Sequence, residues 1–395
     1  MTNNTKNVIQ KGDFRILIGN SNKIHNAHRI NADIKIFEKF CEGRYCEHLP
    51  RITSRISGMH SIPHHITSAK ALENAWGVEI PKPALKLRKL MMNASQYSTQ
   101  LMHYLAITTP DLKTIYYGDP SIPEVLQVLN KFTKYDVSNL QMMDFGQRLV
   151  AELGGKVIHP ISVIIGGIEK PMKESSRDKF LKQIDRQIEL TEQLVKDGVK
   201  VIEDNWNIIT KVDEVPANNF GITNNGTHGL YEGILRIVDK DGKKTDYEIK
   251  DYKSALETNN MTRSNSLAMI NAADNMATPL AEEELKIFKD KNGIVSNNLF
   301  MVQWARLIEL LESIECIKDL LEDSDICNSN CKTLDINPNE AEGIGITSTS
   351  RGLLIHHLWS DSEGICKKIN IFDENIHIKD IENTYNIISK QINKI

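Results

Sequence analysis

Residues 51–81 read RITSRISGMHSIPHHITSAKALENAWGVEIP, in which three histidines come just before a run of helix-forming residues. Pro63 fits the first turn of a helix, because proline lacks a backbone N–H and is tolerated there. Gly77 fits the end of the same helix, since glycine readily adopts the left-handed conformation of a C-cap. The stretch therefore predicts a turn of metal-binding type that leads into a helix, although it contains no cysteine.

Long amphipathic segments and two hairpins follow this stretch. Residues 83–110 carry apolar side chains at a 3.6-residue period over a wide stripe, which predicts a long helix buried on most sides. Residues 177–204 and 297–323 predict two more long helices. Residues 229–249 and 351–372 predict β-hairpins that turn at DKDGK and DSEG. The predicted fold class is mainly α with small β insertions (α+β), with long buried helices and β-hairpins.

The length and composition predict a single large domain over residues 1–395. Within it we expect a strand-and-turn part at residues 1–82, a helical core at 83–323, and a C-terminal hairpin and helix at 340–395. The C-terminal helix itself is predicted at residues 377–395. The chain is 40% hydrophobic and 25% charged, which is typical of a globular protein that buries a large core.

Charge and apolar runs exclude several classes of protein. The net charge is −4 with both signs interspersed, whereas a nucleic-acid-binding protein would need a basic face. No apolar run approaches the about 20 residues that cross a bilayer. The first residues, MTNNTKNVIQKGDF, lack the apolar core of a signal peptide, so we expect a cytoplasmic protein. Six irregularly spaced cysteines do not form a disulfide framework and are expected to be reduced thiols.

Seven segments occur in the order of a known family. They are FEKFCEGR…LPRITSRISG, AKALENAWGVEIP, ELGGKVIHPISVIIGGIEKP, GLYEGILRIVDKDG, NAADNMATPLAEEEL, NNLFMVQWARLIELLE and RGLLIHHLWSDSEGICKKINI. From about residue 13 to about residue 375, the chain resembles the large subunit of [NiFe] hydrogenases. It looks like the cytoplasmic archaeal type, F420-reducing or F420-non-reducing, which feeds electrons to a deazaflavin or to heterodisulfide reductase.

The resemblance implies a nickel–iron centre held by four thiolates, two of them from an Arg-x-Cys-Gly-x-Cys-x3-His motif. Arg55, Gly58 and His64 match this motif. Its two cysteine positions are occupied by Ser57 and His60. A serine hydroxyl is far harder to ionise than a thiol, and soft thiolates suit this redox-active metal pair. The sequence therefore predicts a divergent member without the nickel-ligand cysteines, with no nickel–iron centre and no other cofactor in this chain.

Further matches complete the candidate site. Arg351, within STSRG, matches an arginine that approaches the iron's ligands in the family. Glu38 matches a carboxylate that binds magnesium in some relatives. The family's second cysteine pair would fall beyond Ile395, and some archaeal relatives carry that pair on a separate short peptide. If the pocket persists, Arg55 and Arg351 would be buried and would need anionic partners or water. The expected vestigial pocket, with no catalytic role assigned, comprises Arg55, Ser57, His60, His64 and Arg351.

Two interpretations of the histidines remain open. His60 and His64 are four residues apart and would share a helix face, as the ligands of a zinc site do. Pro63 lies between them and no carboxylate falls at a matching spacing, which weakens that geometry. In the other interpretation, which we favour, Ser57 and His60 fill a vacated pocket with hydrogen bonds.

Three functions are compatible with the retained segments and the lost cysteines. The first is a degenerate large subunit, structural or regulatory, that pairs with an iron–sulfur small subunit and with heterodisulfide-reductase-like or deazaflavin-linked subunits. The second is a redox enzyme subunit that reuses the vacated cavity for another substrate, as a relative in respiratory complex I does for quinone. The third is a hydrogenase whose thiolates come from other chains. The sequence leaves open whether the chain is an enzyme, and it predicts neither a nucleic-acid partner nor a membrane span.

Overall fold

The computed structural model describes residues 5–11, 14–19, 24–29, 32–105, 136–210, 214–257 and 262–373. The predicted C-terminal helix at residues 377–395 lies outside the described residues, as does the last part of the helix predicted at 83–110. None of the described helices is long and apolar enough to cross a membrane.

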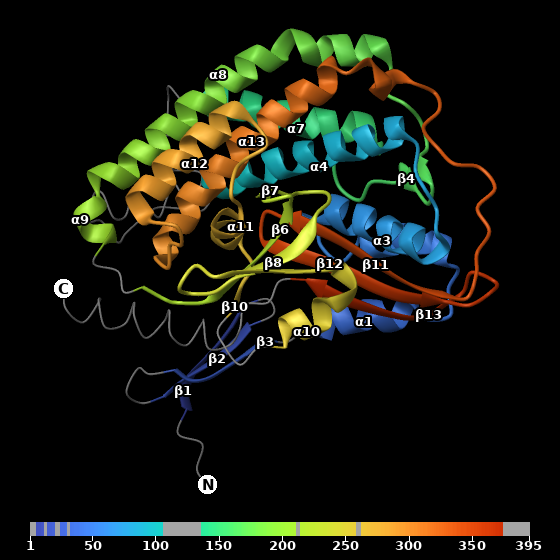
Figure 1. Cartoon of the computed structure of the whole chain (residues 1–395), viewed down its shortest axis with the longest axis horizontal. Helices are drawn as coiled ribbons and strands as arrows, with labels where there is room; N and C mark the ends of the chain where they lie inside the picture. Colours follow the sequence, from blue (N-terminus) through green and yellow to red (C-terminus); the bar gives the residue numbers. More distant parts are fainter. Residues whose placement is uncertain are drawn as a thin grey trace.

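Long helices form one side of the molecule, where α8 runs along the top with α13 and α4 beneath it (Figure 1). The helices are α1 (Ala32–Cys41), α2 (Leu49–Thr53), α3 (Ser61–Trp76), α4 (Lys82–His103), α7 (Asp136–Gly154), α8 (Glu174–Asp204), α9 (Trp206–Ile209), α10 (Tyr252–Leu256), α11 (Ser266–Ala272), α12 (Pro279–Asn292) and α13 (Val302–Glu322). Leu87, Leu90 and Met91 of α4 lie in one buried cluster with Leu310 and Ile314 of α13. The wide apolar stripe predicted for α4 is therefore covered by neighbouring helices, as its width requires.

Strands make small, mostly antiparallel sheets. They are β1 (Thr5–Lys11), β2 (Phe14–Gly19), β3 (Ile24–Arg29), β4 (Val163–Ile164), β5 (Gly167–Ile168), β6 (Asn218–Asn224), β7 (Thr227–His228), β8 (Ile234–Val238), β9 (Lys244–Tyr247), β10 (Thr262–Arg263), β11 (Ala341–Thr349), β12 (Gly352–Ser360) and β13 (Cys366–Asp373). The sheet orders are β1-β2-β3, β10-β6-β8-β9 with β7 beside β6, β11-β12-β13, and β4-β5. The predicted fold class, mainly α with small β insertions, is confirmed.

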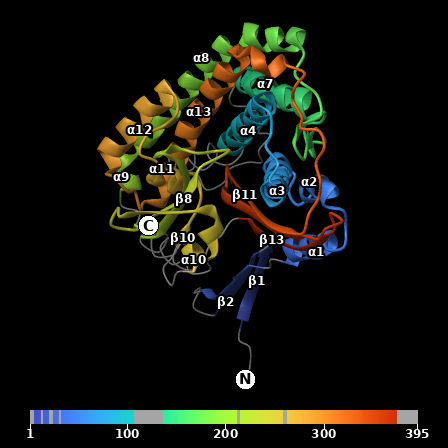
Figure 2. The same ribbon diagram turned by 45° about the vertical axis from the view of Figure 1, so that its right-hand side comes forward.

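The β11-β12-β13 sheet carries α3 on β11 and α1 against β13, as the two views in Figures 1 and 2 show. Gly343 and Gly345 on β11 allow the close approach of α3. A Cβ atom on Gly343 would lie 2.1 Å from the carbonyl oxygen of Ala71, so no larger residue fits. This packing places the end of β11 beside the first turn of α3, where the candidate site lies.

Both predicted hairpins are present. β8 and β9 pair on either side of the DKDGK turn, where Gly242 has a φ of 88°. β12 and β13 pair around the DSEG turn, whose Gly364 donates its N–H to the carbonyl of Asp361. The strand-and-turn part predicted for residues 1–82 differs, because α1, α2 and α3 occupy its second half. Helix α1 packs against β13, and that tertiary contact is absent from local patterning. The division into domains stays a prediction.

Candidate functional site

Helix α3 begins at Ser61 with Pro63 in its first turn and ends at Gly77, whose φ of 63° is left-handed, as predicted. The segment before it folds back as α2 and a short turn. The hydroxyl of Thr53 donates to the carbonyl of Leu49 at 2.9 Å and lies 3.3 Å from the carbonyl of His64. These contacts hold the motif residues 55–60 at the N-terminal end of α3.

His60 precedes α3 and is buried, with 2% of its surface exposed. Its Nε2 lies 3.0 Å from the Ser350 hydroxyl, at the turn between β11 and β12. Burial lowers the pKa of His60 to about 3, against the opposing influence of the Asp373 carboxylate. The ring is therefore neutral at pH 7. The backbone N–H of His60 donates to the hydroxyl of half-buried Ser57 at 3.3 Å, so both former cysteine positions are engaged within the fold.

His64 and His65 are fully buried but face different partners. Nδ1 of His64 lies 3.0 Å from Nε2 of His356 on β12. Nδ1 of His65 contacts the carbonyl of Pro50 at 2.8 Å, and its Nε2 accepts the N–H of Val163 at 3.2 Å. His65 is therefore the Nδ1–H tautomer, and burial lowers its pKa to about 4.

The three histidines of the motif stretch thus bind three separate partners. No group of three histidine, cysteine or acidic side chains with metal-binding geometry occurs in the described part of the chain. The arrangement agrees better with hydrogen-bonded filling of the pocket than with a zinc site built by these residues.

Arg55 and Arg351 differ from the expectation, because both are exposed. Arg351 lies at the tip of the β11–β12 turn, with Nη2 3.8 Å from the sulfur of Met59. The buried arginine of this region is instead Arg306 of α13. It donates to the carbonyl of Ser350 at 2.8 Å and to the side-chain oxygen of Gln100 at 2.7 Å. The positive charge behind the site therefore comes from a helix far away in sequence, which motif matching did not reveal.

A buried ionic cluster continues from Arg306. Gln100 donates to Glu309, and the His228 ring lies between the carboxylates of Glu309 and Glu312. Burial acts to lower the pKa of His228, but the two carboxylates outweigh it and raise that pKa to about 10. The acidic residues stand three apart in the apolar helix α13, and that departure from the pattern was the available sequence signal.

Replacing His228 by glutamine should give a pH-dependent loss of stability. Because the folded-state pKa of His228 exceeds its unfolded value of 6.5, its stabilising contribution is complete below about pH 6.5 and disappears as pH rises through about 10. Wild-type and variant free energies of unfolding, measured with urea, should therefore converge across that interval by about 1.4 kcal/mol per pH unit at most. His48→Gln, at an exposed histidine, is the control. A difference that is constant with pH would contradict the prediction.

Glu38 is buried and already has two partners. Its carboxylate accepts the N–H of Ile371 at 2.9 Å and lies 2.6 Å from Nζ of Lys35. It therefore ties α1 to β13. Its assignment as a magnesium ligand stays a prediction.

Three of the cysteines belong to an apolar cluster. Cys41, Cys46 and Cys366 are fully buried with Leu49 and Leu72 among their neighbours. Burial raises the pKa of Cys41 to about 12, which disfavours the thiolate that a metal would require. These thiols therefore contribute to the core.

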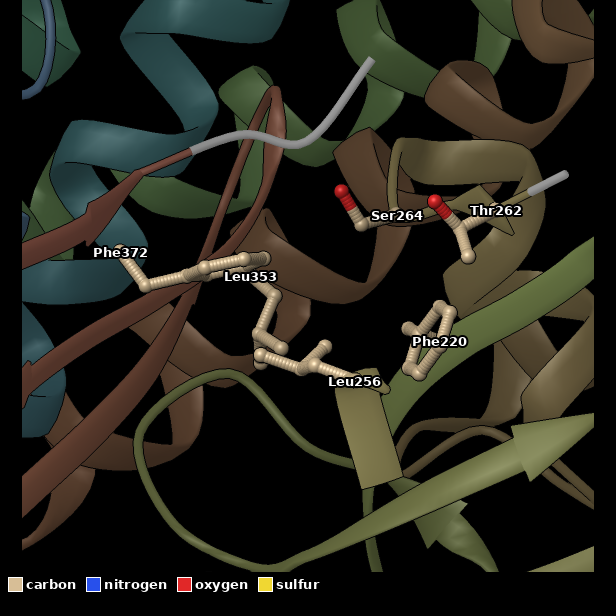
Figure 3. Close-up of a pocket in the computed structure, with 6 residues that line it drawn as sticks. All are labelled: Phe220, Leu256, Thr262, Ser264, Leu353 and Phe372. Atoms are coloured by element: carbon tan, nitrogen blue, oxygen red, sulfur yellow. The ribbon is translucent and has the colours of Figure 1, made fainter. Parts of the chain in front are cut away.

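A small recess lies on the other side of the β11–β12 turn (Figure 3). It is lined by Phe220, Leu256, Thr262, Ser264, Leu353 and Phe372. Its walls are mainly apolar, with two hydroxyl groups at one side, and none of the five candidate site residues lines it.

Comparisons with known proteins agree with this architecture. A family model described as nickel-dependent hydrogenase matches residues 35–116. In Methanocaldococcus jannaschii, one subunit of the vhu F420-non-reducing hydrogenase is 35% identical over 86% of this chain and 86% of that protein. The NAD-reducing hydrogenase HoxS subunit beta of Cupriavidus necator is 25% identical over 89% of this chain and 80% of that protein.

Solved structures share the fold. A crystal structure of an NAD+-reducing [NiFe]-hydrogenase in the H2-reduced state superposes with a TM-score of 0.85 at 23% identity, covering 97% of this chain and 90% of that one. The reduced Ni-Fe-Se hydrogenase of D. vulgaris Hildenborough gives a TM-score of 0.71 at 17% identity, covering 95% and 94%. The chain belongs to the nickel-dependent hydrogenase family, as a member of its large-subunit group.

This membership contradicts the prediction that the chain has no nickel–iron centre, because the family is nickel-dependent and the solved neighbours are nickel enzymes. The sequence argument was wrong in treating two substituted positions as proof of an absent cofactor. The donors present at the turn, the hydroxyl of Ser57 and the neutral imidazole of His60, nevertheless do not fit a centre held by thiolates.

Proposed function

We propose that this chain is the large subunit of a cytoplasmic, hetero-oligomeric electron-transfer complex of the hydrogenase type, in which its own side chains do not activate hydrogen. Its partner would be an iron–sulfur small subunit, with a heterodisulfide-reductase-like or deazaflavin-linked subunit beyond it. The observation that carries the proposal is the contact of His60 with Ser350 at 3.0 Å, which engages one former thiolate position inside the fold.

The chemistry of the two substituted positions supports this role. Hydrogen activation in the family depends on thiolates that bind metal and accept protons. Ser57 supplies a hydroxyl, which does not ionise near neutral pH. His60 is neutral and buried, and its Nε2 is engaged by the Ser350 hydroxyl, so this nitrogen already has a partner within the protein.

A second candidate is a redox enzyme subunit that uses the same region for another substrate. The polar cluster of His60, His64, His356 and Asp373 favours it, because buried polar groups are costly and are retained where they serve a ligand or a reaction. The names of the relatives favour a third candidate, a hydrogenase whose thiolates come from another chain.

The test is an anaerobic pull-down of the tagged chain from its native host. We expect an iron–sulfur protein to co-purify in a fixed ratio, and the complex to show no hydrogen-dependent viologen reduction that depends on Ser57. Nickel and iron are measured in the same eluate. Hydrogen-dependent reduction that Ser57→Ala abolishes would overturn the proposal, as would the absence of any iron–sulfur partner. Nickel with hydrogen-dependent activity that survives Ser57→Ala would favour thiolates from another chain.

The control for this variant is Ser54→Ala. Ser54 lies near Ser57 in sequence, and its hydroxyl donates to the carbonyl of Arg51 at 2.9 Å, away from the motif positions. Both variants should recover the same partner in the same ratio.

A further inference from the structure

His64, His356 and Asp373 form a continuous buried line. Nδ1 of His64 lies 3.0 Å from Nε2 of His356, and Nε2 of His64 lies 3.3 Å from a carboxylate oxygen of Asp373. The two rings are tilted by 46° with centroids 5.3 Å apart. Both histidines are completely buried, whereas the Asp373 side chain, at the end of β13, is 12% exposed. The line therefore runs from the interior of the sheet toward its edge.

The partners determine the tautomers of both rings. The Asp373 carboxylate can only accept, so Nε2 of His64 carries the proton that faces it. Nδ1 of a neutral His64 is then an acceptor, and Nε2 of His356 carries the proton between the rings. Nδ1 of His356 is left as a bare lone pair, and it has no hydrogen-bond partner among the residues that the structure describes.

The surroundings of His356 explain why that lone pair is open. Its neighbours across the sheet are Gly345 on β11 and Ile371 on β13, and neither side chain is polar. Burying a polar nitrogen without a partner costs about 1–3 kcal/mol. A leucine, as at Leu354 and Leu358 on the same strand, would avoid that cost.

Charged groups from several elements face this line. Asp373 comes from β13, and its carboxylate opposes the effect of burial on the pKa of His356. His60, before α3, lies close enough to be influenced by Asp373 and His64, and also by Arg351 and Arg306. The single carboxylate in direct contact with the two rings is therefore the natural proton acceptor, with cations farther back.

We propose that His356, His64 and Asp373 constitute a proton relay that carries a proton from the interior of the sheet to its edge. A proton from an acidic donor, such as hydronium or a bound acid, forms an N–H bond at Nδ1 of His356. The Nε2 proton of His356 moves to Nδ1 of His64, and the Nε2 proton of His64 moves to the Asp373 carboxylate. One proton enters and one reaches Asp373, no electrons are transferred, and both rings end as Nδ1–H tautomers. The relay is independent of the proposed function.

The test is an acid titration of the full chain labelled with 15N-histidine and 13C-aspartate, followed by NMR. We expect both rings to be Nε2–H tautomers at neutral pH. On acidification, Nδ1 of His64 and of His356 should shift together from the range of bare ring nitrogen to that of N–H, at the same midpoint as protonation of the Asp373 carboxylate. His65 is the internal control, because it is equally buried on the same helix turn but bonded at both nitrogens.

Variants separate the relay from ordinary titration. Asp373→Asn keeps an acceptor oxygen but cannot take a proton, so it should abolish the joint tautomer switch. Asp185→Asn, at an exposed carboxylate on α8, should leave the switch unchanged. If Asp373→Asn does not fold, the wild-type tautomers alone decide, since an Nδ1–H tautomer at either ring at neutral pH would overturn the relay. Separate midpoints, charging of one ring alone, or no switch before acid unfolding would also overturn it.

Discussion

Replacing Glu73 by alanine is expected to lower the free energy of unfolding by about 3–5 kcal/mol, the cost of leaving a buried partner charge uncompensated. The guanidinium of Arg88 is completely buried and lies 2.6 and 2.8 Å from the two carboxylate oxygens of Glu73. It also donates to the carbonyls of Ile164 and Gly167. Urea unfolding monitored by circular dichroism measures the loss.

The same substitution also releases a loop. Glu73 accepts the N–H of Gly166 at 2.8 Å, so its carboxylate holds the β4–β5 segment as well as Arg88. Glu192→Ala is the matched control, because Glu192 pairs with Lys196 at an exposed position on α8. It should change stability by less than about 1 kcal/mol. Equal effects of the two substitutions would show that the Glu73–Arg88 pair does not contribute as a buried pair.

Replacing Gly345 by alanine should cost about 3 kcal/mol, at the upper end of overpacking effects. The added Cβ would lie 2.2 Å from the carbonyl oxygen of Thr67 and 2.7 Å from the backbone nitrogen of Ala71. Both atoms belong to the backbone of α3, which cannot move aside as a flexible side chain does. The melting temperature, followed by calorimetry, should fall, and the contact between His60 and Ser350 should loosen because β11 leads directly to that serine.

Gly58→Ala is the control for the glycine substitution. An added Cβ at Gly58 meets no atom within 4 Å, and its backbone lies outside the left-handed region. Its melting temperature should remain within the error of the wild type. A Gly345 variant as stable as the Gly58 variant would mean that α3 and β11 can separate without cost, contrary to the packing described.

Several local features could be predicted because their causes are local. Pro63 and Gly77 bound α3 through backbone preferences that act within one turn. The turns at DKDGK and DSEG formed hairpins for the same reason. The stripe of α4 predicted its burial, although it did not predict which helix would cover it.

Residue order alone was enough to identify the family, the helical class and the residues at the motif, including Ser57 and His60 in place of cysteines. The partner of each polar group, in contrast, became known only from the folded chain. His60 contacts a serine 290 residues away, His64 contacts a histidine 292 residues away, and Arg351 is exposed while Arg306 is buried behind the site. Burial and hydrogen bonding depend on how distant segments pack, and a local pattern contains no information about that packing.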